Sequence, residues 1–157
     1  MKFSSQEEYG LRCLLRIARD AGDKGLTIPE ISQAEGITTA NVAKLLRVLR
    51  LGGILGSSRG QIGGYSLSRP ADKIPLSEVL SVLGGRLYDS EFCNSHTGVQ
   101  DICTNSTDCS IRSLWQTVQN AVDDVLTKIT LKDLVASGDV VVTKILDPNK
   151  EYIDISN

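Results

Sequence analysis

The chain has 157 residues, of which 41% are hydrophobic and 23% are charged, so its composition is that of a folded rather than a disordered protein. One histidine excludes sites that need two from the same chain, and the P-loop, nucleophile-elbow and zinc-protease motifs are absent. These features favour a protein that is not an enzyme. No secretory signal or apolar stretch of membrane-spanning length is visible, so we expect a cytoplasmic protein with no membrane partner.

The net charge of −2 conceals two halves of opposite sign. Residues 1–70 carry 10 Lys and Arg against 6 Asp and Glu, whereas residues 71–157 carry 7 against 13. The stretch from Gly36 to Ala71 contains no acidic residue. A basic block beside an acidic remainder favours a polyanionic partner, with a solvated basic face as the alternative.

Capping signals predict two helices in the first 36 residues. A capping box formed by Ser5 and Glu8 marks the start of the first helix. A second box, formed by Thr27 and Glu30, starts a short helix that ends at Gly36, where a C-cap glycine belongs.

A third helix is predicted between Gly36 and Gly52. Its core-facing stripe consists of Val42, Leu45, Leu46 and Leu49. The opposite face carries small and polar residues first and cations later, as the recognition helix of a helix-turn-helix does. The predicted base-edge contacts are Thr38, Thr39 and Asn41, and the predicted phosphate contacts are Lys44 and Arg47. A plain amphipathic surface helix is the alternative.

Two short strands, 54–58 and 65–67, follow this helix and flank a glycine-rich segment. A hairpin directly after a recognition helix forms a wing, and Arg59 at its tip is suited to the negative potential of a minor groove. The helix-turn-helix, the acid-free block and the wing occur in one continuous run. Together they predict binding to double-stranded DNA.

A polar loop between Glu91 and Ser110 contains three cysteines and the histidine of the chain: Cys93, His96, Cys103 and Cys109. A fourth cysteine, Cys13, lies among leucines and is interpreted as a small buried hydrophobe. In a cytosolic protein, clustered cysteines favour metal binding. Spacing alone leaves open a zinc site, an iron–sulfur cluster, or a loop that is unliganded or forms a disulfide.

The segment from Ile111 to Ile129 repeats apolar residues at three- and four-residue spacing, which predicts a long amphipathic helix. Its stripe is too extensive for a small winged domain to cover, so we expect a symmetric dimer seam. The predicted seam residues are Trp115, Val118, Val122 and Val125. Packing against a helix predicted at 76–83 is the alternative. A short helix then stops at Gly138, and Val140–Val142 is strand-like.

The predicted fold is therefore mainly α with a small β-hairpin wing: a winged helix-turn-helix plus a long C-terminal dimerisation helix. Its parts are a DNA-binding domain at 1–72, a connecting helix and linker at 73–91, a cysteine loop at 92–110, dimerisation and cap helices at 111–137, and a tail at 138–157. A two-fold protein of this kind matches a palindromic DNA site.

The order of these parts resembles the bacterial iron–sulfur-sensing transcription regulators of the IscR, NsrR and RsrR group. The matching segments are Tyr9–Leu15, the wing Ser58–Leu67, the three loop cysteines, Leu114-Trp115 and Ile129–Leu134. The resemblance implies a cytosolic homodimer that binds palindromic promoter DNA. It further implies a cluster ligated by Cys93, Cys103 and Cys109, whose redox state, nitrosylation or presence changes DNA binding. The alternatives are a winged-helix DNA-binding protein with a structural zinc site and a cluster-bearing redox protein.

The chain departs from this group in two places. Nine residues separate Cys93 from Cys103, so the loop is longer than usual. Arg112 stands where IscR-like members have a histidine ligand. NsrR- and RsrR-like members use an acidic ligand that aligns with Glu8, so the resemblance implies Glu8 of the partner subunit as the fourth ligand, with His96 as the alternative. A two-iron and a four-iron cluster both fit.

Overall fold

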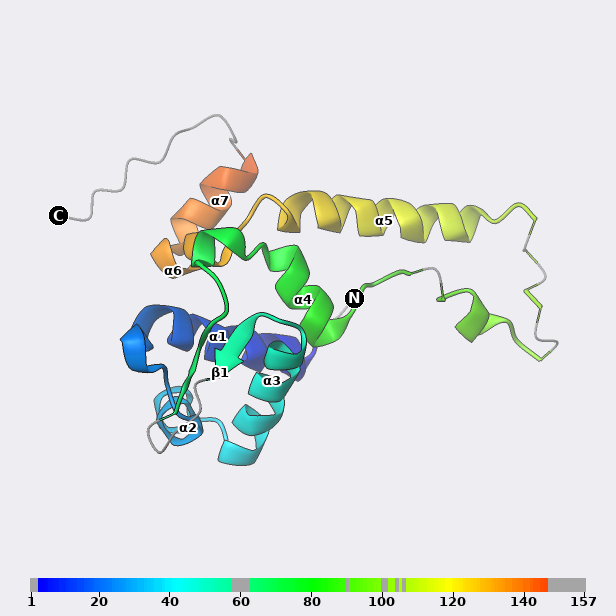
Figure 1. Ribbon diagram of the computed structural model, residues 1–157. Helices are drawn as coiled ribbons and strands as arrows, with labels where there is room; N and C mark the ends of the chain where they lie inside the picture. Colours follow the sequence, from blue (N-terminus) through cyan, green and yellow to red (C-terminus); the bar gives the residue numbers. More distant parts are fainter. Residues whose placement is uncertain are drawn as a thin grey trace.

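A computed structural model describes residues 3–57, 63–89, 91–99, 102–103, 105 and 107–146. This part of the chain contains seven α-helices and one two-stranded antiparallel sheet, which confirms the predicted fold class (Figure 1). The helices are α1 (Ser5–Asp20), α2 (Ile28–Glu35), α3 (Thr39–Leu51), α4 (Leu76–Gly84), α5 (Ser110–Leu126), α6 (Leu131–Ala136) and α7 (Gly138–Leu146). The strands are β1 (Leu55–Ser57) and β2 (Tyr65–Leu67).

The molecule has two regions of different shape (Figure 1). We call the described residues of 3–84 and 129–146 the body, in which α1, α2, α3, α4, α6 and the sheet pack together. We call the described residues of 85–126 the arm. There, α5 extends to one side of the body, and the segment containing the cysteines runs outward and returns to the start of α5.

The body is built around the apolar stripes of α1, α3 and α4. Its fully buried side chains include Leu14, Ile17, Leu45, Leu46, Leu49 and Val79. Two glycines let α4 approach closely: a Cβ on Gly10 would lie 2.5 Å from Leu83 Cδ2, and one on Gly52 would lie 2.5 Å from Val82 Cγ1. Consequently α4 contacts both α1 and the end of α3.

The cap of α1 lies one residue earlier than predicted. Ser4, not Ser5, is the N-cap: its side chain accepts from the Glu7 amide at 3.2 Å, and the Glu7 carboxylate accepts from the Ser4 amide at 2.6 Å. The sequence holds two overlapping S-x-x-E matches, and the earlier one adds a helical hydrogen bond from Glu8 N to Ser4 O at 3.1 Å. The carboxylate of Glu8 is therefore outside the cap, and Glu8 is exposed.

The C-terminal elements also differ from the prediction. The strand-like Val140–Val142 run lies in the helix α7, because Val140 is buried beside α6 and Lys144 pairs with Asp133 at 2.6 Å. These contacts override the β propensity of the valines. In addition, α5 ends at Leu126, and Ile129 lies beyond it as a buried residue whose carbonyl accepts from Leu76 N at 2.9 Å. No helix in the described ranges has the length and hydropathy of a membrane span.

Candidate DNA-binding face and cysteine cavity

The helix α2 is fixed to α1 by one carboxylate, that of Glu35. Its two oxygens accept from Arg12 Nε at 3.1 Å and Arg16 Nε at 2.8 Å, and Arg12 also donates to the Glu35 backbone carbonyl at 2.5 Å. The Glu35 side chain is only 11% exposed. Glu35 is the last residue of α2, so this network fixes the point where the chain turns toward α3.

The turn and the start of α3 follow the predicted helix-turn-helix. Gly36 adopts the left-handed conformation with φ of 66°, which favours glycine at a helix C-cap. Thr38 is the N-cap of α3, and its hydroxyl accepts from Asn41 N at 3.4 Å. Thr39 is exposed at the start of the helix. The predicted base-contacting residues therefore lie together at one helix N-terminus.

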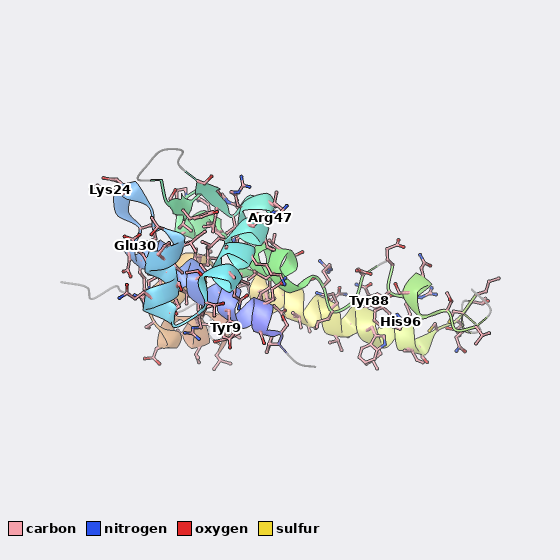
Figure 2. All side chains as sticks on the ribbon, turned by 90° about the horizontal axis from the view of Figure 1, so that it is seen from below. Tyr9, Lys24, Glu30, Arg47, Tyr88 and His96 are labelled. Carbon is pink, nitrogen blue, oxygen red and sulfur yellow. The ribbon has the colours of Figure 1, made fainter. Side chains whose placement is uncertain are left out.

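The cations of α3 differ from those of α1. Lys44, Arg47 and Arg50 are exposed and form no ion pair with any residue in the described ranges. Arg12 and Arg16, by contrast, are paired with carboxylates. Figure 2 shows Arg47 on the outer face of α3. This face can therefore neutralise phosphates without first breaking internal ion pairs.

The wing is attached to the body through its second strand. Leu55 pairs with Leu67 and Ser57 with Tyr65 in the antiparallel ladder, and Tyr65 also exchanges backbone hydrogen bonds of 2.7 and 2.9 Å with Leu26. Gly64 makes this approach possible, since a Cβ there would lie 2.8 Å from the backbone of Gly25. Arg59 and the rest of the predicted wing tip lie outside the described residues.

The three loop cysteines line one cavity of about 320 Å³ at the N-terminal end of α5, which we call the cysteine cavity. Cys93, Cys103 and Cys109 are all half-buried free thiols. His96 and Trp115 also line the cavity, whereas Glu8 does not. The structure thus brings together the three predicted thiolate ligands and the alternative fourth ligand, but not Glu8 of the same chain.

Two of these sulfurs each lie beside a hydrogen-bonding group. Arg112 N donates to Cys109 Sγ at 3.3 Å, and Tyr88 Oη lies 3.8 Å from Cys93 Sγ. A hydrogen bond with the Cys93 side chain raises the pKa of Arg112, and burial followed by the contact with Cys93 raises the pKa of Tyr88. Soft thiols with nearby N–H and O–H donors suit a bound iron–sulfur group, whose sulfurs accept such bonds.

The described part of the cysteine cavity contains no preformed site for a single ion. Within the described residues, no three side chains of the ligating types lie close enough to hold a single metal ion. The residue types that line the cavity suit either an iron–sulfur group or a zinc ion.

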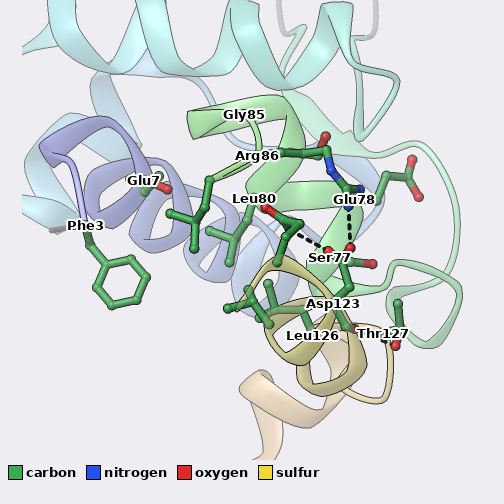
Figure 3. Close-up of a pocket in the computed structure, with 14 residues that line it drawn as sticks. Phe3, Glu7, Ser77, Glu78, Leu80, Gly85, Arg86, Asp123, Leu126 and Thr127 are labelled. Atoms are coloured by element: carbon green, nitrogen blue, oxygen red, sulfur yellow. Dashed lines mark hydrogen bonds and ion pairs between the residues drawn. The ribbon is translucent and has the colours of Figure 1, made fainter. Parts of the chain in front are cut away.

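The helix α5 presents an apolar stripe that the chain itself leaves exposed. The exposed fraction is 55% for Ile111, 54% for Leu114, 39% for Trp115 and 37% for Val125. Val118 and Val122 are half-buried. A groove of about 640 Å³ lies between α4, α5 and the chain start, and Figure 3 shows Phe3, Leu80 and Leu126 around it.

Sequence reasoning missed Gln119, which is 3% exposed in the middle of α5. Its Oε1 accepts from Tyr88 N at 3.0 Å, and its Nε2 donates to Asp123 Oδ1 at 2.9 Å. Asp123 in turn pairs with Arg86. One sequence signal could have identified Gln119: it stands beside Val118, on the face of the helix that the apolar spacing predicts to be buried. This network fixes the segment after α4 to α5, directly before the cysteine loop.

Comparison with known proteins identifies relatives that are transcriptional regulators, in agreement with the helix-turn-helix described above. Residues 3–137 match the Rrf2 family, described as iron-dependent transcriptional regulators. Protein rrf2 of Nitratidesulfovibrio vulgaris is 33% identical over 85% of this chain and 87% of that protein. The regulator IscR of Pectobacterium carotovorum is 28% identical over 100% of this chain and 85% of that protein. The solved structure of T. potens IscR superposes with a TM-score of 0.65 at 26% identity, covering 86% of each chain. The chain belongs to the Rrf2 family of transcriptional regulators.

Proposed function

We propose that this regulator binds promoter DNA under the control of an iron–sulfur cluster held by Cys93, Cys103 and Cys109. The observation that carries the proposal is the meeting of three thiols in one cavity of a chain whose body is a winged helix-turn-helix. When bound, the cluster would supply sensitivity to redox state, nitric oxide or iron–sulfur supply. The name of the relative IscR and the family's description as iron-dependent support this assignment.

On the DNA, we assign base edges to Thr38, Thr39 and Asn41, and phosphates to Lys44 and Arg47. The first three lie at the N-terminus of α3, which enters the major groove first in proteins of this type. Arg59 is assigned to the minor groove beside the wing.

The cysteine cavity is connected to the recognition helix through α4. Val82 of α4 covers Gly52 at the end of α3, and Leu83 packs on Gly10 of α1. The chain then runs directly into Arg86 and Tyr88, which are held by the side chains of α5. A change in the cavity next to Tyr88 would therefore reach α4, which packs against α1 and against the end of the recognition helix α3.

A homodimer is part of this proposal. The exposed stripe around Trp115, Val118, Val122 and Val125 continues into the groove between α4 and α5, so a second copy's α5 has an apolar surface to cover. A two-fold pair of recognition helices would match a palindromic promoter site. Glu8 lies outside its own chain's cavity, so as a cluster ligand it would have to come from the partner subunit.

The test is anaerobic purification without metal-binding tags, followed by iron, sulfide and zinc analysis and visible absorption. We expect a coloured protein with iron and acid-labile sulfide, and their loss when Cys93, Cys103 and Cys109 are changed to Ser. The matched control is Cys13→Ser, which removes a buried thiol outside the cavity and leaves the iron content unchanged. A colourless protein with stoichiometric zinc would contradict the cluster.

A further inference from the structure

His96 occupies a specific place in the cysteine cavity. It ends the short turn Asn94–His96, three residues after Cys93, and lines the cavity together with all three loop cysteines. Tyr88 and His96 both lie along α5, whereas Tyr9 lies on the body near the start of α1 (Figure 2). Both views place the described part of the cysteine loop away from α1, which contains Glu8 (Figures 1 and 2). Within one chain, His96 therefore lies nearer to the cysteines than Glu8 does.

The imidazole of His96 is fixed by two contacts. Its Nδ1 lies 2.7 Å from the carbonyl oxygen of Phe92, and its ring stacks on the Phe92 ring with centroids 4.3 Å apart and planes 20° from parallel. The Phe92 ring itself packs against Tyr88 at 5.4 Å. A carbonyl only accepts, so Nδ1 must carry the proton and donate it. In the neutral ring the lone pair is then on Nε2.

This is the arrangement of a metal-binding histidine. Such histidines donate one ring N–H to a backbone carbonyl, which fixes the tautomer and leaves the other nitrogen as the ligand. Among the residues that line the cavity, His96 supplies an imidazole, whereas the guanidinium of Arg112 and the indole of Trp115 have donors but no lone pair for a metal. Three thiolates leave one iron coordination position of a cluster open. Imidazole nitrogen binds iron beside thiolates in known iron–sulfur centres.

We infer that Nε2 of His96 is the fourth ligand of the group held by Cys93, Cys103 and Cys109. The inference rests on the proposed cluster and names the ligand that completes it. It replaces a ligand from the partner subunit with one from the same loop. Each chain of a dimer would then hold its own cluster without contributing a donor to the other chain.

The test exploits the single histidine of the chain. Tag-free protein labelled with ¹⁵N only in histidine is loaded anaerobically with iron and sulfide, reduced with dithionite and measured by pulsed electron paramagnetic resonance. We expect a ¹⁵N hyperfine coupling from a directly bound nitrogen, which His96→Ala abolishes. A cluster-loaded wild-type protein without this coupling overturns the inference and leaves the proposed function intact.

Two further variants sharpen the result. His96→Cys supplies a thiolate in place of the nitrogen, so we expect iron and sulfide content to stay at the wild-type level while the ¹⁵N coupling disappears. Glu8→Gln should keep the coupling, and a cluster spectrum that changes in Glu8→Gln but not in His96→Ala would overturn the inference in favour of Glu8. Wild-type protein that takes up no iron and sulfide contradicts the proposed function itself, and the inference with it.

Discussion

The body and the arm of this protein differ in how much of their apolar surface is buried. In the body, the apolar stripes of α1, α3 and α4 face one another, and side chains such as Leu14 and Leu46 have no exposed surface. In the arm, α5 keeps Ile111 and Leu114 more than half exposed, and its one buried residue is the polar Gln119. The body buries its apolar stripes within one chain, whereas the arm keeps an exposed apolar stripe and three half-buried thiols, where the proposed second copy and cluster would bind.

This difference separates the region that stabilises the fold from the region proposed to bind the cluster. The hydrophobic surface that stabilises the fold lies in the body, where each fully buried leucine contributes on the order of 2 kcal/mol. The arm contributes few such residues, so under the proposed control its conformation would change without unfolding the body. Contact between α4 and both regions provides the connection.

The largest effect is expected from a charge in the apolar stripe of the arm. Val122→Glu would bury an unpaired carboxylate in the proposed seam, costing about 3–5 kcal/mol of dimer stability. Light scattering during gel filtration should then show a folded monomer. Asn120→Glu, on an exposed position of the same helix, should remain dimeric. A folded Val122→Glu protein that stays dimeric would place the seam elsewhere.

The thiols of the two regions should differ sharply in reactivity. Burial, with the nearby Glu35 charge, raises the pKa of Cys13 to about 11, and Cys13 has no exposed surface. Its thiolate fraction at pH 7 is therefore about 10⁻⁴. In metal-free, reduced protein, iodoacetamide should modify Cys93, Cys103 and Cys109 at least ~100-fold faster than Cys13. Mass spectrometry of timed samples checks this, and comparable rates at all four cysteines would show that the body is not closed around α1.

A smaller loss of stability is expected from the carboxylate that joins α1 and α2. Glu35→Ala removes the partner of both Arg12 and Arg16, and we expect a loss of about 1.5–3 kcal/mol in urea unfolding. Asp20→Ala breaks only an exposed i,i+4 pair with Arg16, so it should cost about 0.3–0.5 kcal/mol. Equal losses in the two variants would mean that Glu35 does not hold the helices together.

The smallest effects concern single phosphate contacts. Lys44→Ala and Arg47→Ala should each lower the slope of log affinity against log salt by about 1, because each removes one neutralised phosphate. Fluorescence anisotropy at several salt concentrations measures this slope. Lys128→Ala, an exposed cation in the turn after α5, is the matched control and should leave the slope unchanged. An unchanged slope in Arg47→Ala would remove α3 from the interface.

The winged body could be predicted from sequence because its signals are local. Capping residues, glycine at Gly36 and the leucine stripe of α3 each act within a few residues, and the structure has them where the pattern predicts. The first cap was misplaced because Ser4 and Ser5 both fit the same motif. The tail helix was missed because Val140 takes its conformation from contact with α6, which no local pattern records.

The candidate site was only partly predictable, for a related reason. Three cysteines on a polar loop favour metal binding wherever the loop lies, so the sequence could name them as candidate ligands. Which further residue joins them depends on how the loop folds against α5. The hydrogen bond from His96 to the Phe92 carbonyl and the one from Tyr88 N to Gln119 depend on the folded chain. Residue spacing alone does not predict them.

The most direct test of cluster control compares the DNA affinity of one protein in two states. Duplexes are selected from a random pool with cluster-loaded and with metal-free protein, and their affinities are measured anaerobically for both forms and for the variant with Cys93, Cys103 and Cys109 changed to Ser. We predict that the loaded and metal-free forms differ by about 5- to 150-fold on the same duplex, the usual range of coupling between two sites. The serine variant should behave as the metal-free form in both preparations. Equal affinities of the loaded and metal-free forms on every selected duplex would contradict cluster control of DNA binding.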